Sequence, residues 1–136
     1  MTDASKAPRR EPPLSPHLQV WRWHITMATS ILHRATGVAL YVGALIAAAW
    51  AVSLLRGPQA YGQFKALLGS PLGKVVMFGL TLSLFFHLAN GLRHLTWDAG
   101  RGLGVKTANA TAVVAFAFAL AATAAVWWIA AMTGAL

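Results

Sequence analysis

The sequence contains no cysteine. Disulfide bridges, thiolate nucleophiles, and zinc or iron–sulfur sites held by cysteine are therefore excluded for this chain. Charged residues are also scarce, at 10% of 136 residues against about 25% in an average soluble domain. Only Asp3, Glu11 and Asp98 are acidic, whereas eleven residues are Lys or Arg, and the net charge is +8. Such a composition is not that of a water-solvated domain.

Hydrophobic residues, by contrast, make up 57% of the chain and gather in three long runs. Crossing a bilayer takes about 20 consecutive apolar residues in a helix. The pattern predicts an all-α membrane protein whose three transmembrane helices form one anchor domain over residues 30–136. The helices are expected over about 30–55, 71–97 and 108–134, with a short interfacial helix over about 60–68 after the first.

The N-terminal residues differ from the rest of the chain. Residues 1–16 are polar and rich in proline, which predicts an extended tail. Residues 17–29 combine tryptophans with cations, and tryptophan favours the headgroup layer, so a short interfacial segment is expected there. The first apolar run starts too late for a signal peptide. The tail is also short for a transit peptide, which favours a bacterial inner membrane over a mitochondrial one.

The cations are divided unequally between the two expected sides of the membrane. Eight flank the N-terminal side: Lys6, Arg9, Arg10, Arg22, Arg34, Arg93, Arg101 and Lys106. Three flank the opposite side: Arg56, Lys65 and Lys74. Since cations collect on the cytoplasmic side, the N-terminus is predicted inside and the C-terminus outside. This distribution accounts for the positive charge, so the expected partner is the lipid bilayer and not nucleic acid.

The end of the second predicted helix carries a polar stripe. Residues His87, Asn90, Gly91, His94 and Asp98 stand at i, i+3, i+4, i+7 and i+11, and therefore share one helix face. Polar groups are costly in hydrocarbon and usually face a partner within the membrane. The stripe predicts an interior site at this end.

His87 is the deepest imidazole of this stripe. It could hydrogen-bond a neighbouring carbonyl, relay protons, or serve as an axial ligand to haem iron. Gly91 would leave a flat surface for a porphyrin. The residues available to its propionates are Arg34, Arg93, His94 and His33. Because the other imidazoles lie nearer the interface, a second axial ligand would come from another polypeptide.

The start of the first helix carries a second stripe. Ser30, His33, Arg34 and Gly37 stand at i, i+3, i+4 and i+7. The Ser30 hydroxyl and the Arg34 guanidinium form a donor pair that could hold the carbonyl oxygen of a quinone, although Ser30 could instead cap the helix. No nucleophile–base pair, phosphate loop or metal-ligand cluster is evident, so no catalytic residue is expected.

These stretches resemble a known family, the large membrane-anchor, cytochrome b subunit of succinate dehydrogenase (respiratory complex II). The resemblance lies in the segment from Ser30 to Gly37, SILHRATG, and in the pattern His87-x-x-x-Gly91-x-Arg93-His94-x-x-x-Asp98. The three-span layout agrees with it, so the resemblance covers about residues 15–136.

The resemblance implies roles for these residues. His87 would be an axial ligand of haem b, and the second axial histidine would belong to the small anchor subunit. Ser30 and Arg34 would line the ubiquinone site. His33, Arg34, Arg93 and His94 would lie near the haem propionates. Flavoprotein and iron–sulfur subunits would dock on the inner face and carry out the succinate chemistry.

The sequence thus predicts a membrane-anchor subunit of a succinate:quinone oxidoreductase. It would ligate haem b and form part of the site where electrons from succinate reduce ubiquinone. The alternative is a small membrane scaffold or transporter subunit without a cofactor, in which His87 and Arg34 form a buried polar contact.

Overall fold

The computed structural model describes residues 22–134, which form four helices and no strand. The helices are α1 (Ile25–Leu55), α2 (Pro58–Gly69), α3 (Pro71–Asp98) and α4 (Val105–Met132). The predicted all-α fold with three long helices is confirmed, and α2 is the short helix expected between the first two. The tail over residues 1–16 and the stretch 17–21 lie outside the described residues.

The first helix begins earlier than the sequence suggested. His24 is its extended N-cap, and the helix runs unbroken from Ile25, so residues 25–29 belong to it and do not form a separate segment. No proline or glycine interrupts these residues. The Thr29 hydroxyl donates to the carbonyl of Thr26 within the helix (2.8 Å). Ser30 therefore lies inside the second turn and is not an N-cap.

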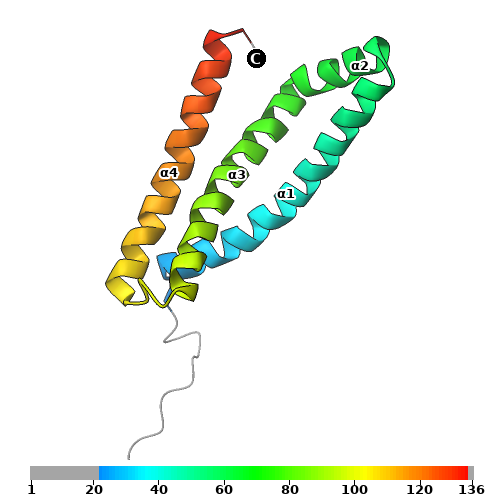
Figure 1. Ribbon diagram of the computed structural model, residues 1–136. Coiled ribbons are helices and arrows are strands. Elements are labelled where there is room, and N and C mark those ends of the chain that lie inside the picture. The colour runs from blue at the N-terminus through cyan, green and yellow to red at the C-terminus, as the bar shows by residue number, and fades with distance from the viewer. Residues whose placement is uncertain (1–21, 135–136) are drawn as a thin grey trace, which may run out of the picture.

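The connections follow from local chemistry. Gly57 has a φ of 95°, a left-handed conformation that glycine adopts without strain, and Pro58 opens α2 directly after it. Ser70 caps α3 as predicted, since its Oγ accepts a hydrogen bond from the backbone N–H of Gly73 (3.1 Å). These turns fold α3 back alongside α1 (Figure 1).

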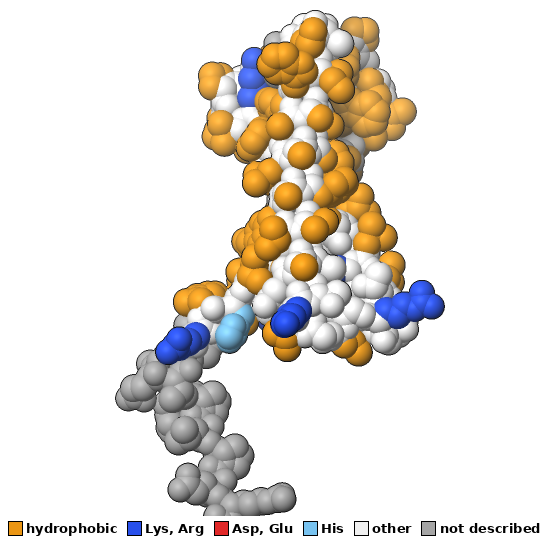
Figure 2. Space-filling model, turned by 90° about the vertical axis from the view of Figure 1, so that its left-hand side faces the viewer, with side chains coloured by type: hydrophobic (Ala, Val, Ile, Leu, Met, Phe, Trp, Pro, Cys, Tyr) orange, Lys and Arg blue, Asp and Glu red, His pale blue; other side chains and the backbone are white. Residues whose placement is uncertain are grey.

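The three long helices contain 31, 28 and 28 residues, and each is apolar enough to cross a membrane. At 1.5 Å per residue they are roughly 42–47 Å long, longer than the roughly 30 Å hydrocarbon core. Hydrophobic side chains cover the middle of the face shown in Figure 2, and Lys and Arg side chains lie towards its two ends. This surface is typical of a protein embedded in a bilayer.

Helix α3 packs against both α1 and α4. Small residues of α4, namely Ala112, Ala115 and Ala119, are buried and allow close approach. The start of α1, the end of α3 and the start of α4 meet at one end of the bundle, shown at the bottom of Figure 1. We call this the polar end, because it brings together the two polar stripes predicted from the sequence.

Candidate functional site

Three imidazoles stack at the polar end. The His33 ring from α1 lies between two rings from α3, with its centroid 3.9 Å from that of His87 and 4.9 Å from that of His94. The ring planes differ by only 14° and 18°. All three side chains are half-buried. The packing of α1 against α3 therefore joins two stripes that lie more than 50 residues apart in the sequence.

The hydrogen bonds of His87 determine its tautomer. Its Nδ1 lies 3.1 Å from the carbonyl oxygen of His33 and 3.2 Å from Oγ1 of Thr36. A carbonyl oxygen only accepts, so Nδ1 carries the hydrogen and donates it. The neutral ring then keeps a free lone pair on Nε2. This is the form in which histidine binds a metal, with the other ring nitrogen held by a carbonyl.

Two glycines near this site have different surroundings: Gly37 contacts the His87 ring, whereas Gly91 lies one turn after His87 on α3. A Cβ added at Gly37 would lie 3.3 Å from Cε1 of His87, so the missing side chain lets the ring rest against α1. A Cβ added at Gly91 would meet nothing within 4 Å, apart from the helix's own backbone. No side chain of the described residues covers Gly91 on the helix face it shares with His87. A flat ligand could lie there.

The other two imidazoles also have defined surroundings. Nδ1 of His94 lies 2.7 Å from the carbonyl oxygen of Asn90 and must donate to it. Its Nε2 could then donate to a carboxylate only when the ring is doubly protonated. Nδ1 of His33 is buried and has no hydrogen-bond partner among the described residues. A buried polar atom without a partner is costly, so a polar ligand at this end would relieve the cost.

Arg93, expected from the sequence near the haem propionates, has its side chain buried within the protein. Only 6% of its surface is exposed, and its guanidinium carbon lies 4.1 Å from the centre of the Trp97 ring. Its donors reach four acceptors: Thr29 Oγ1 (3.1 Å), Asn90 Oδ1 (3.1 Å), Thr111 Oγ1 (3.1 Å) and the Ala108 carbonyl (2.9 Å). Arg93 is thus directed into the interface between the three long helices.

Ser30 and Arg34 remain available at the start of α1. Ser30 is half-buried and Arg34 is exposed, one helical turn further along. Within the part of the chain that the structure describes, neither side chain has a hydrogen-bond partner. Two adjacent donors, a hydroxyl and a guanidinium, are thereby free to bind a carbonyl or carboxylate oxygen.

Sequence reasoning missed the roles of two threonines. Thr36 lies within the segment SILHRATG but was not counted with Ser30, His33, Arg34 and Gly37, although it stands three residues after His33 and so near the same helix face. Thr111 carried no signal, because a threonine in an apolar helix usually bonds its own backbone, as Thr111 also does to Thr107 (3.0 Å). Its contact with Arg93 depends on how α4 packs.

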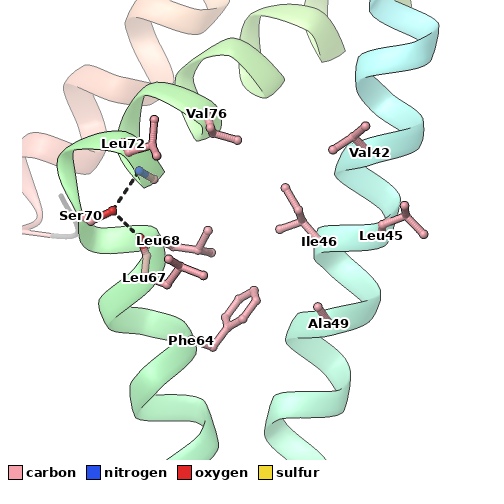
Figure 3. A pocket seen from close by; sticks show the side chains of 11 residues that line it. Val42, Leu45, Ile46, Ala49, Phe64, Leu67, Leu68, Ser70, Leu72 and Val76 are labelled. Atoms are coloured by element: carbon pink, nitrogen blue, oxygen red, sulfur yellow. Dashed lines mark hydrogen bonds between the residues drawn. The ribbon is translucent and has the colours of Figure 1, made fainter.

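A separate apolar cavity of about 420 Å³ lies at the opposite end, between α1, α2 and the start of α3 (Figure 3). Its lining side chains are aliphatic or aromatic apart from Ser70, whose Oγ already bonds the Leu67 carbonyl and the Gly73 N–H. This cavity therefore offers no charged side chain to a ligand.

The chain is similar to known proteins over most of its length. A family model described as Succinate dehydrogenase/Fumarate reductase transmembrane subunit matches residues 8–135. The chain is 39% identical over 109 residues to the succinate dehydrogenase cytochrome b556 subunit of Paracoccus denitrificans, covering 80% of this chain and 82% of that protein. The corresponding subunit of Rickettsia felis is 37% identical over 109 residues, covering 80% and 85%.

A mitochondrial relative shows the same similarity over a shorter length. The succinate dehydrogenase cytochrome b560 subunit of Sus scrofa is 41% identical over 95 residues, which cover 68% of this chain and 56% of that protein. Because the family model matches nearly the whole chain, this protein belongs to the family of succinate dehydrogenase/fumarate reductase transmembrane subunits.

Proposed function

We propose that this chain is the haem-ligating membrane anchor of a succinate:quinone oxidoreductase. The observation that carries the proposal is the 3.1 Å contact between His87 Nδ1 and the His33 carbonyl oxygen, because a proton on Nδ1 leaves Nε2 free to bind iron. The open face at Gly91 supports it, because a porphyrin beside His87 needs such a surface. The names of the relatives, cytochrome b556 and b560, agree with a bound b-type haem.

The residues present fit this cofactor. His87 would hold the iron, and a histidine of the small anchor subunit would supply a second ligand. His33, His94 and Arg34 would lie toward the propionates, and the buried His33 Nδ1 would gain a polar neighbour. Arg93 is left out of this set, because its donors are already engaged within the chain. When bound, haem b supplies a one-electron redox centre.

Ser30 and Arg34 would form this chain's share of the quinone site. The hydroxyl and the guanidinium would donate hydrogen bonds to one quinone carbonyl oxygen and orient the ring. A charged donor also favours the negative charge that such an oxygen gains on reduction. The rest of the site would come from the small anchor and iron–sulfur subunits, and the flavoprotein subunit would oxidise succinate.

The orientation follows from the cations. The polar end carries Arg22, Arg34, Arg93, Arg101 and Lys106, and would face the cytoplasm of a bacterium whose inner membrane holds the complex. The soluble subunits would dock there. The cofactor-free scaffold is less well supported, because a simple buried contact between His87 and Arg34 does not form: His87 bonds His33 and Thr36 instead.

The haem assignment can be tested on the purified, assembled complex. The wild-type complex should show the reduced absorption band of a b-type haem, and His87→Ala should weaken or shift it. His24→Ala is the matched control, because this exposed histidine caps no helix with its side chain. An unchanged spectrum and midpoint potential in His87→Ala would show that another residue ligates the iron.

The quinone assignment can be tested on the same complex. Ser30→Ala and Arg34→Leu should each lower succinate-driven quinone reduction while sparing reduction of a soluble dye by the flavoprotein. Ser53→Ala and Arg56→Leu make the same substitutions near the opposite end of α1 and should spare both activities. Equal loss of both activities in the first pair would mean that assembly failed, and the site assignment would lose its support.

A further inference from the structure

Arg93 differs from every other cation of the described chain in being almost fully buried. A guanidinium has five N–H donors, and here they make four hydrogen bonds through all three nitrogens. A charge within a membrane helix is costly unless it is paired or fully hydrogen-bonded. Among the described residues the cost is met by four neutral acceptors and the face of Trp97, and no carboxylate contributes.

The acceptors come from all three long helices. Thr29 belongs to α1, Asn90 to α3, and Thr111 and Ala108 to α4. Asn90 strengthens the α1 contact, since its Nδ2 donates to the backbone carbonyl of Thr29 (3.0 Å) while its Oδ1 accepts from Arg93. Asn90 and Thr29 are both completely buried. We call these five residues the arginine cluster.

The arginine cluster adjoins the proposed site directly. Thr29 immediately precedes Ser30 in α1, and His33 follows one turn later. On α3, Arg93 immediately precedes His94. Hydrogen bonds of about 3 Å weaken steeply when they are stretched or bent, so these bonds define the position of the first turns of α1 against α3.

We propose that Arg93 is a positioning residue of the haem and quinone site, and that α4 takes part in the site through Thr111. The arginine cluster holds the turn bearing Ser30, His33 and Arg34 in register with the His87 face of α3. It does so without touching either cofactor. The effects expected on haem and quinone rest on the proposed function, whereas the hydrogen bonds of the arginine cluster do not.

The test uses the assembled complex with Thr111→Val, which has nearly the same shape as threonine but removes the acceptor for Arg93 Nε. We expect the quinone KM to rise by about two- to thirtyfold with a smaller change in kcat, as for residues that act through a packed network. The EPR signal of the oxidised haem should broaden or shift. Thr111→Ser keeps the acceptor and should resemble wild type.

Amide hydrogen exchange supplies a readout that is independent of activity. A peptide covering residues 25–34 should exchange faster in both variants, because the guanidinium that bonds Thr29 is no longer held from α4 in Thr111→Val and is absent in Arg93→Lys. Thr107→Val is the matched control: it makes the same change one turn earlier on α4, where Arg93 makes no hydrogen bond. Residues 25–34 should exchange no faster in the double variant Arg93→Lys/Thr111→Val than in Arg93→Lys alone. Both substitutions remove the same hydrogen bond, from Arg93 Nε to Thr111 Oγ1.

The outcomes separate the alternatives. If Arg93 binds a propionate instead, Thr111→Val will match Thr107→Val in all readouts while Arg93→Lys lowers haem content, and the positioning role is refuted. Independent, additive effects of the two substitutions would also refute it. If His87→Ala keeps the wild-type haem spectrum while Thr111→Val still loosens residues 25–34, the assignment of His87 as the iron ligand fails and the structural role of the arginine cluster stands.

Discussion

Gly37 gives a sharp test of how His87 is held. A Cβ at this position would lie 3.3 Å from Cε1 of His87 and 3.8 Å from Nδ1. The first distance is shorter than an ordinary contact by a few tenths of an ångström. The ring cannot move away without lengthening its hydrogen bonds to the His33 carbonyl (3.1 Å) and to Thr36 (3.2 Å), both already near the upper limit of good geometry. Gly37→Ala should therefore displace the imidazole.

The size of the effect follows from these contacts. Overpacking a well-packed site costs about 1–3 kcal/mol, and alanine returns only about 0.5–1 kcal/mol through its higher helix propensity. Disturbing the hydrogen bonds that orient a metal-ligating histidine weakens metal affinity by about 10–100-fold. Gly37→Ala should accordingly lower haem retention by about tenfold or more while the helices still form.

The assay measures haem per flavin in the purified complex, together with the rate at which haem is lost to an excess of a haem-free acceptor protein. Gly62→Ala is the control, because a Cβ there meets nothing within 4 Å. Equal haem retention in both variants would refute the argument that Gly37 makes room for the imidazole. Equal loss in both would point to general destabilisation.

Three further substitutions probe other contacts. Thr36→Val removes one acceptor of His87 Nδ1 but leaves the carbonyl, so it should shift the haem midpoint potential with little haem loss, as redox titration would show. Gly73→Ala would press a Cβ against backbone carbonyls at the end of α2, which cannot give way, and should lower the melting temperature of the complex and its yield. Asn90→Leu should lower the free energy of unfolding by about 1–3 kcal/mol, measured by thermal unfolding, because the Thr29 carbonyl and the Arg93 guanidinium each lose a buried hydrogen-bond partner.

Much of the fold could be predicted from the sequence because the bilayer imposes strict limits. An apolar run long enough to span the hydrocarbon must be helical, since its backbone groups have no water to bond. The Gly57-Pro58 and Ser70-Pro71 pairs marked the turns for similarly local reasons. The start of α1 was misjudged because Ser30 resembles an N-cap, whereas no local feature of residues 25–29 opposes a helix.

The candidate site could be predicted only in part. Helical spacing placed His87, Gly91 and His94 on one face, and Ser30, His33 and Arg34 on another. It could not distinguish Arg34, which lies exposed, from Arg93, which is buried, because both stand near helix ends among apolar residues. The difference arises from acceptors contributed by other helices.

The sequence by itself determined the three long apolar helices and which side chains share a helix face, because these depend on composition and on the pitch of one helix. The tertiary structure decided the tautomer of His87, the ring stack around His33, and the enclosure of Arg93. Each of these requires an atom from a second helix within about 3–5 Å, and such pairings depend on how the helices pack.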